Sequence, residues 1–346
     1  MLDSPIPLDA RKQQILKAVV ADYTRTGIPV GSQALAIHLA SWSSATIRNE
    51  LATLVNVGYL IQPHTSAGRV PSDLGYRYYV DFLMEEEDVP VAVRRQMDPF
   101  FAGSPMNIEE ILENAAAGLA VVTDSVSLVT GPRSLGVKVK HLDLVSLDPD
   151  RALVLLVLEG NVVRQQSLAL RQPADQGVLS ELAAQLNGEL CGLDATSIAG
   201  LPVSKGRHAA LRKEVLDDIV TFMEASNAQQ DALVVHDGMR NLLHKPEFED
   251  VERLQQVLEV VEEERVLAEL IAALDVDSGV QIMIGRETGL DQLSRCSLVL
   301  TTYRAGRQRG GTIGVLGPTR MRYDQVGARV RYAAQRVGRM LVRVLS

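Results

Sequence analysis

Residues 43–56 carry side-chain types that can form hydrogen bonds with a nucleic acid. If this segment is a helix, Ile47 marks a buried face that also holds Leu51, Leu54 and Val55. The opposite face and its flanks carry small, amide, hydroxyl and guanidinium groups, at Ala45, Thr46, Arg48, Asn49, Ala52, Thr53 and Asn56. Small residues permit close approach to a DNA groove, and Arg and Asn reach base edges. We therefore predict groove recognition by this face; an ordinary solvated helix face, the alternative, usually carries more Glu and Lys.

A polar loop at residues 64–69 has the composition of a DNA-binding wing. It contains hydroxyls, a flexible glycine and one fixed positive charge, Arg69, which suits the phosphate backbone or the minor groove. A plain solvent-exposed hairpin is the alternative. We expect Arg48 and Asn49 to contact base edges, with Thr46 and Ala45 in support. The other candidate DNA contacts are Ser32, Ser43, Ser44, His64, Thr65, Ser66, Tyr76 and Arg77.

Apolar spacing and turn residues define the elements that would position these side chains. The predicted elements are a helix over 8–26 that ends at Gly27, a short helix capped by Ser32, a helix from a Ser43 cap to about Val57, strands at 59–61 and from Val70, and a fourth helix from about Ser72. Three helices followed by a two-stranded hairpin is the order of a winged helix-turn-helix. A generic small helical domain has the same periodicity and stays open as an alternative.

The chain changes character after Pro90. The predicted elements are a helix over 107–122, an antiparallel meander of strands at 137–147, 152–159 and 161–170, a helical stretch over 175–248, a long helix over 249–274, strands at 280–284, 297–303 and 311–316, and a last helix over 324–345. Strands, a helical block and strands again indicate one α+β domain with a helical domain inserted in its middle.

The composition of the 346-residue chain limits its class. At about 150 residues per domain the length predicts two or three domains, and the net charge of −8 excludes a uniformly basic nucleic-acid coat. Aromatic residues, at 4%, are too few for a base-stacking platform. Residues 1–84 hold seven Lys or Arg and six Asp or Glu, whereas residues 300–346 hold ten Arg and one acid. We expect the acidic segment 247–264 to neutralise this basic C-terminus, the alternative being a nucleic-acid surface.

The two cysteines, Cys191 and Cys296, do not belong to a C-x-x-C pair. A disulfide framework and a zinc finger are therefore excluded, and the composition suits a reducing cytoplasm. No apolar run approaches the roughly 18 residues of a membrane span. The first ten residues lack the basic and apolar regions of a secretory signal. We expect a cytoplasmic protein with no membrane association, no metal and no other cofactor.

The six histidines are scattered and form no catalytic constellation. His236 and Asp237 are adjacent, but neighbours on a helix do not face one another, and no Ser or Cys nucleophile can be assigned to them. The segments 285–289 and 306–317 contain glycines but lack the Lys-Ser/Thr of a phosphate-binding loop. We therefore expect that the protein is not an enzyme.

Several long runs of the sequence resemble signatures of the HrcA family of heat-inducible transcription repressors. The matching runs are Ser43–Leu51 with Gly58–Leu60, His64–Pro71 with Gly75–Asp81, Gly310–Met321 and, more loosely, Pro246–Phe248. They lie at both ends of the chain in the right order, so the resemblance covers essentially the whole chain.

The resemblance implies a homodimeric repressor that binds an inverted-repeat, double-stranded DNA operator upstream of chaperone operons of the groE and dnaK type. It also implies that the GroEL chaperonin helps to maintain the active form, which is lost on heat stress. The implied α+β multidomain fold has a winged helix-turn-helix at 1–84, a linker at 85–106, a GAF-like α/β domain at 107–171 and 249–346, and an inserted helical dimerisation domain at 172–248. A winged-helix regulator that senses a small molecule through its GAF-like domain is the alternative.

Overall fold

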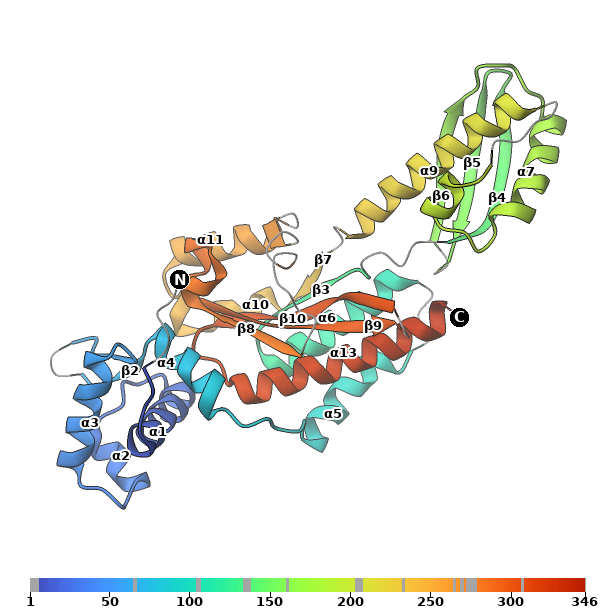
Figure 1. Cartoon of the computed structure of the whole chain (residues 1–346). Helices are drawn as coiled ribbons and strands as arrows, with labels where there is room; N and C mark the ends of the chain where they lie inside the picture. The colour runs from blue at the N-terminus through green and yellow to red at the C-terminus, as the bar shows by residue number, and fades with distance from the viewer. Residues whose placement is uncertain are drawn as a thin grey trace.

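The computed structural model describes residues 6–64, 67–103, 107–132, 138–159, 162–202, 208–231, 234–263, 266–267, 271, 279–305 and 308–345. The molecule is elongated (Figure 1). A helical N-terminal unit lies at one end, a central unit built on a five-stranded sheet lies in the middle, and an inserted unit with a three-stranded sheet lies at the other end. No described helix combines the length and the apolar character that crossing a membrane requires.

The N-terminal unit begins with helix α1, Ala10–Thr26. The Asp9 carboxylate caps the helix by accepting a hydrogen bond from the Lys12 amide at 2.9 Å, a typical N-cap interaction. The helix ends at Gly27, whose φ of 69° lies in the left-handed region that favours glycine. Of the apolar residues that share one face of this helix, Ile15, Leu16, Val19 and Val20 are buried and Tyr23 is half-buried.

The rest of the N-terminal unit has the predicted order of helices and hairpin. Its elements are α2 (Ser32–His38), α3 (Ser44–Asn56), β1 (Leu60–Ile61), β2 (Val70–Pro71), α4 (Asp73–Tyr78) and a π-helical turn (Tyr79–Leu83). β1 and β2 pair antiparallel. One cap is not as predicted: α2 begins after Gly31 without a side-chain cap, and Ser32 is a buried first helical residue.

The segment expected to be a linker contains structure of its own. Helix α5 covers Val91–Met97, and a 3₁₀ turn covers Asp98–Phe101. Met97 and Phe101 are buried in the same hydrophobic core as α6 (Ile108–Thr123). The chain between the N-terminal and central units is therefore fixed against the central unit over at least these residues.

The five-stranded sheet has the order β7-β3-β10-β9-β8, and every neighbouring pair is antiparallel. Its strands are β3 (Val126–Thr130), β7 (Val234–Asp237), β8 (Val280–Ile284), β9 (Cys296–Ala305) and β10 (Gln308–Pro318). The sequence predicted β8, β9 and β10. Sequence reasoning missed β3. It also wrongly assigned β7 to a helical stretch, because the four residues of this strand are two apolar residues followed by two polar ones and do not alternate as a strand pattern would.

Helices cover both faces of this sheet. Val129, Val299 and Ile313 point to the core shared with α6 and α13 (Tyr323–Leu345). Leu128, Leu298 and Leu316 point to a second core. Helices α10 (Met239–Leu243) and α11 (Val251–Glu262) build this second side. The predicted long helix over 249–274 is wrong in its extent, since α11 ends at Glu262.

The inserted unit lies between β3 and β7 in the chain and has its own core. Its elements are β4 (Val139–Asp148), β5 (Arg151–Leu158), β6 (Val162–Ala169), α7 (Gln176–Leu190), α8 (Ala195–Ala199) and α9 (Ala209–Asp231). The predicted meander is confirmed. However, these three strands form a sheet of their own and pack against α7–α9. The inserted unit is thus mixed rather than helical, and it starts before β4 rather than at residue 172.

Helix α7 closes one edge of the three-stranded sheet. The Asn187 amide group accepts from the Leu142 backbone N–H at 2.8 Å and donates to the Leu142 carbonyl at 2.6 Å. Gln176 does the same at the Ser146 N–H, 2.7 Å, and the Leu144 carbonyl, 2.9 Å. These side chains occupy backbone groups that an open β4 edge would offer to another strand.

Candidate nucleic-acid interface

Helix α3 presents the predicted face to solvent. Ile47, Leu51 and Leu54 are buried in the core of the N-terminal unit, and Val55 packs partly against it. The exposed residues of α3 are Ala45, Arg48, Asn49, Ala52 and Asn56. The division of α3 into a buried and an exposed face is therefore confirmed. Thr46 is half-buried at the edge of the exposed face.

Hydroxyl groups fix the start of α3. The Ser43 Oγ accepts a hydrogen bond from the Thr46 amide at 3.2 Å, which confirms Ser43 as the N-cap. The hydroxyls of Ser32 and Ser44 lie 3.1 Å apart and join α2 to α3. The backbone N–H groups of Ser44 and Ala45 lie in the first turn, where amides have no partner inside the helix and the helix dipole favours an anion.

The electrostatics of α3 favour a negatively charged partner on its exposed face. Its acid, Glu50, is directed to α1, where it lies 3.4 Å from Arg11 and 3.3 Å from Lys12. In the described part of the chain, the side chains of Arg48 and Asn49 make no hydrogen bond or ion pair. A free guanidinium and a free amide therefore lie on adjacent residues of an exposed helix face, and the acid of α3 is directed away from this face.

The wing is tied to the segment between α1 and α2. Val30 and Arg69 exchange two backbone hydrogen bonds, at 2.9 and 2.8 Å. The close approach needs Gly68, since a Cβ there would lie 2.5 Å from the Pro29 carbonyl oxygen. The Arg69 guanidinium is half-buried and donates to the Ala67 carbonyl at 3.2 Å. His64 is exposed, and the predicted contacts Thr65 and Ser66 lie outside the described residues.

Tyr76 and Arg77 do not lie on this surface. Tyr76 is only 2% exposed, its ring meets that of Tyr323 edge-on at 5.8 Å, and burial raises the pKa of its phenol. The Arg77 guanidinium donates to both carboxylate oxygens of Glu287, at 2.9 and 2.5 Å, and also to the Ile282 carbonyl. The hydrogen bonds to Glu287 raise the pKa of Arg77. The predicted phosphate contacts Tyr76 and Arg77 therefore hold the N-terminal unit to the central unit.

Sequence reasoning missed a second connection between these two units. The Arg320 Nε donates to the Glu247 carboxylate at 2.6 Å, and its Nη1 donates to the Thr24 carbonyl at the end of α1 at 3.2 Å. The signature runs 246–248 and 310–321 meet in this contact, through Glu247 and Arg320. Nothing in the sequence indicates that they meet residue 24.

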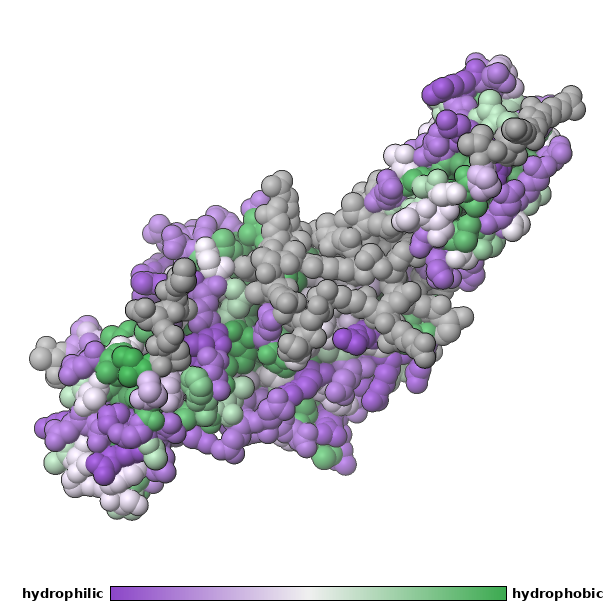
Figure 2. Space-filling view, viewed as in Figure 1, coloured by the Kyte–Doolittle hydropathy of each residue, from purple (hydrophilic) through white to green (hydrophobic). Residues whose placement is uncertain are grey.

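Three of the ten arginines in residues 300–346 pair with acids in the described part of the chain. Arg320 pairs with Glu247, and Arg331 lies 2.8 Å from Glu86. Arg336 lies 3.6 Å from Asp98 and its guanidinium is over the Phe101 ring. The visible surface of α13 remains hydrophilic (Figure 2). These pairs support the neutralisation interpretation only in part, because the predicted acidic segment 247–264 supplies one of the three acids.

Known proteins resemble the chain over almost its whole length. A family model described as the HrcA protein C-terminal domain matches residues 109–326. Relatives described as heat-inducible transcription repressor HrcA include those of Lachnoclostridium phytofermentans, 38% identical over 92% of this chain and 93% of the relative, and Pelotomaculum thermopropionicum, 33% identical over 98% of both. A solved structure described as a hypothetical protein shares the fold, with a TM-score of 0.63, 23% identity and coverage of 98% of this chain and 100% of that one.

Proposed function

The chain belongs to the HrcA family of heat-inducible transcription repressors, and on this basis we propose that it represses transcription by binding an inverted-repeat DNA operator as a homodimer. The observation that carries the proposal is the exposed face of α3, with Arg48 and Asn49 unpaired among the described residues. Specific DNA binding needs exposed donors or acceptors that can reach base edges, because sequence is read through base edges in the grooves.

We propose that α3 enters the major groove. The major groove is about 12 Å wide and accepts one helix. Ala45 and Ala52 allow the helix backbone to approach the bases closely, because their side chains are short. Arg48 can bind guanine with two hydrogen bonds and Asn49 can bind adenine in the same manner. Thr46, at the edge of the exposed face, adds a hydroxyl and a methyl group for a neighbouring base.

Phosphate contacts are assigned to the start of α3 and to the wing. The first-turn amides of Ser44 and Ala45 and the hydroxyl of Ser43 suit one phosphate at the positive end of the helix. His64 and Arg69 suit the adjacent backbone, although Arg69 must leave the Ala67 carbonyl to do so. Thr65 and Ser66 remain candidates from the sequence alone. Ser32 is buried against Ser44 and supports the helix rather than the DNA.

Two copies are needed for tight and specific binding. One α3 reads only a few base pairs, whereas a two-fold symmetric dimer reads two half-sites of an inverted repeat. The outer face of the three-stranded sheet is a suitable contact between copies. Its central strand β5 carries Leu153, Leu155 and Val157 on this face, and none of the three belongs to the core of the inserted unit.

A second copy of the chain is the occupant we propose for this face. Val145, Leu147 and Val163 extend it and are 38%, 51% and 56% exposed. The flanking His141 and Asp143 are polar, and an apolar centre with a polar rim is typical of a stable interface. Because Asn187 and Gln176 occupy the β4 edge, stacking of two sheet faces fits better than pairing along that edge.

The target operons and the chaperonin partner are proposed from the family to which the chain belongs. The relatives are described as heat-inducible repressors, so we propose that the operator lies upstream of chaperone operons of the groE and dnaK type. We also propose that a GroEL-type chaperonin maintains the active form. Heat would then fill the chaperonin with other unfolded chains, and repression would be lost.

A gel-shift titration tests the proposed function. Full-length protein is titrated against an inverted-repeat promoter of a chaperone operon, with a duplex of scrambled half-sites as competitor. We expect tight binding that is lost on scrambling. Salt dependence should be modest, because the N-terminal unit has little net positive charge. Equal, weak binding to both duplexes in the presence and absence of chaperonin contradicts the proposal.

A further inference from the structure

We propose that Arg77 and Arg320 are positioning residues that hold the N-terminal unit on the central unit and thereby set the spacing of half-sites that the dimer accepts. The proposal rests on the proposed function, since it assumes a dimer with two α3 helices on DNA. Neither arginine would contact DNA. Both would act through the orientation of α3.

The first contact is made by Arg320 from the central unit. Its guanidinium lies against Gly27, where a Cβ would be 3.3 Å from the Arg320 Cζ, and donates to the Thr24 carbonyl. This carbonyl is one of the last four of α1, which lack partners inside the helix and carry the negative end of its dipole. Glu247 holds the other side of the guanidinium. Arg320 and Glu247 are 16% and 19% exposed, so solvent screens the pair little.

The second contact is made in the opposite direction, by Arg77 from the N-terminal unit. Its two hydrogen bonds to Glu287 fix the plane of the guanidinium, and a third goes to the Ile282 carbonyl of β8. Glu287 is itself held by the Ile284 amide at 2.8 Å. Beside it, Asp73 accepts from the Arg286 amide at 3.3 Å. The N-terminal unit is therefore bound at two separate points, which removes rotation about either one.

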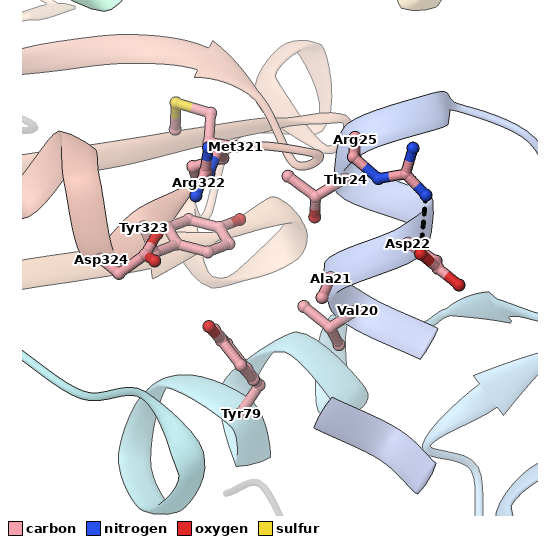
Figure 3. Close-up of a pocket in the computed structure, with 10 residues that line it drawn as sticks. All are labelled: Val20, Ala21, Asp22, Thr24, Arg25, Tyr79, Met321, Arg322, Tyr323 and Asp324. Atoms are coloured by element: carbon pink, nitrogen blue, oxygen red, sulfur yellow. Dashed lines mark hydrogen bonds and ion pairs between the residues drawn. The ribbon is translucent and has the colours of Figure 1, made fainter. Parts of the chain in front are cut away.

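The space between the two contacts is not fully packed. A pocket of about 490 Å³ lies between α1, the π-helical turn and the start of α13 (Figure 3). In this view Tyr79 and Thr24 point into the pocket. A second pocket of about 470 Å³ lies between α4, β8 and α13. Between them, Tyr323 touches Tyr76 edge-on. One hydrophobic core extends from the N-terminal unit into the central unit and includes Tyr76 and Tyr323. The two pockets interrupt the packing on both sides of this contact, so directional hydrogen bonds add to apolar packing in fixing the angle between the units.

This arrangement assigns spacer selection to the contacts between units. Adding one base pair between half-sites moves them apart by about 3.4 Å and rotates one by about 34°. A rigid pair of α3 helices can follow only one spacing, whereas a loosely held pair can follow several. A loosely held pair also binds the best operator less tightly, because rigid connection raises the effective concentration of the second site.

The test uses two paired substitutions in the full-length protein, R320M/E247Q and R77M/E287Q. Replacing both partners avoids a buried carboxylate without a counter-charge, which would destabilise the fold for another reason. Arg322→Ala is the matched control. It removes a positive charge two residues from Arg320, from an exposed side chain with no ion pair in the described part of the chain.

An inverted-repeat duplex is first selected with the wild-type protein, and its spacer is then changed by one and by two base pairs in each direction. For the wild type and Arg322→Ala we expect at least a tenfold loss of affinity at two base pairs. For each paired variant we expect less than a threefold spread between spacers and about tenfold weaker binding to the best one. Affinity for a single half-site should stay within twofold of wild type.

The spacer profile separates positioning from simple destabilisation, because an unstable protein loses affinity equally for every spacer. Melting temperatures and circular dichroism identify a paired variant that fails to fold. The spacer profile of the other paired variant then decides whether the proposal holds. A wild-type profile in a folded paired variant overturns this proposal. If the wild-type protein selects no inverted repeat, that result contradicts the proposed function and not the positioning role of the two arginines.

Discussion

Arg48→Ala removes the side chain that we expect to read a base most directly. The guanidinium is exposed and unpaired in the described part of the molecule. Its loss leaves no buried partner without a hydrogen bond and creates no cavity. Exposed substitutions of this kind change stability by no more than about 0.5 kcal/mol. Any large effect on DNA binding is therefore an effect on the interface.

The expected loss follows from the geometry of one contact per subunit. A guanidinium with two hydrogen bonds to guanine contributes about 1–3 kcal/mol of discrimination, or about 5- to 150-fold in affinity for a half-site. A dimer on an inverted repeat makes the contact twice, so the full operator should lose about 2–6 kcal/mol if the two half-sites are independent. Discrimination should disappear at one base position in each half-site and persist elsewhere.

The assay is fluorescence anisotropy on a panel of operators with each base of one half-site changed in turn. Arg25→Ala is the control: it removes the same charge from the same unit, at an exposed residue whose partner is Asp22 at 2.9 Å. The reasoning is refuted if Arg48→Ala keeps both the affinity and the base preference of the wild type. An equal loss in Arg25→Ala would show that overall charge, and not recognition, is responsible.

Three further changes test the fold, the dimer and the electrostatics. A Cβ on Gly75 would lie 2.0 Å from the Tyr59 carbonyl oxygen, so Gly75→Ala should lower the free energy of unfolding by about 1–3 kcal/mol; an unchanged urea midpoint contradicts this. Leu155→Asp should convert the dimer to a folded monomer in analytical ultracentrifugation, and a persistent dimer contradicts the sheet-face contact. Burial raises the pKa of Asp73, so the native state binds its proton more tightly than the unfolded state, and stability falls as pH rises through the native value. Asp73→Asn should therefore melt higher than wild type at pH 7, with the difference vanishing below about pH 4, and a difference independent of pH would count against this.

The sequence predicts α3 well because the forces that form it are local. Ser43 caps the helix through an amide three residues away, and Ile47 and Leu54 are buried because their spacing places them on one side. The exposed face is then determined without knowledge of the rest of the chain. The same reasoning gives α1, α6 and α13, whose bounds differ from those predicted by only one or two residues.

Partners distant in sequence could not be predicted in this way. Strand-like runs separated by turn residues identified β4, β5 and β6 as strands. This pattern does not say which sheet contains them, and a separate sheet satisfies it equally well. Tyr76 and Arg77 show the same limit at a candidate site. A tyrosine and an arginine on a short helix suit phosphate as well as a domain contact. Glu287, 210 residues away, decides between them.

The position of these partners also changes what the signature runs indicate. Of the signature runs, the one at 43–51 supplies Ala45, Arg48 and Asn49 to the exposed face of α3. Arg77, Glu247 and Arg320 come from three other runs, and all three lie between the N-terminal and central units. A repressor that reads two half-sites needs both the chemistry of base contact and a fixed distance between two reading helices. The helix face can supply the first requirement by itself, but the second depends on a continuous path from α3 through the central unit to the partner copy. The contacts of Arg77 and Arg320 lie on that path, at a place where two pockets interrupt the packing between the units.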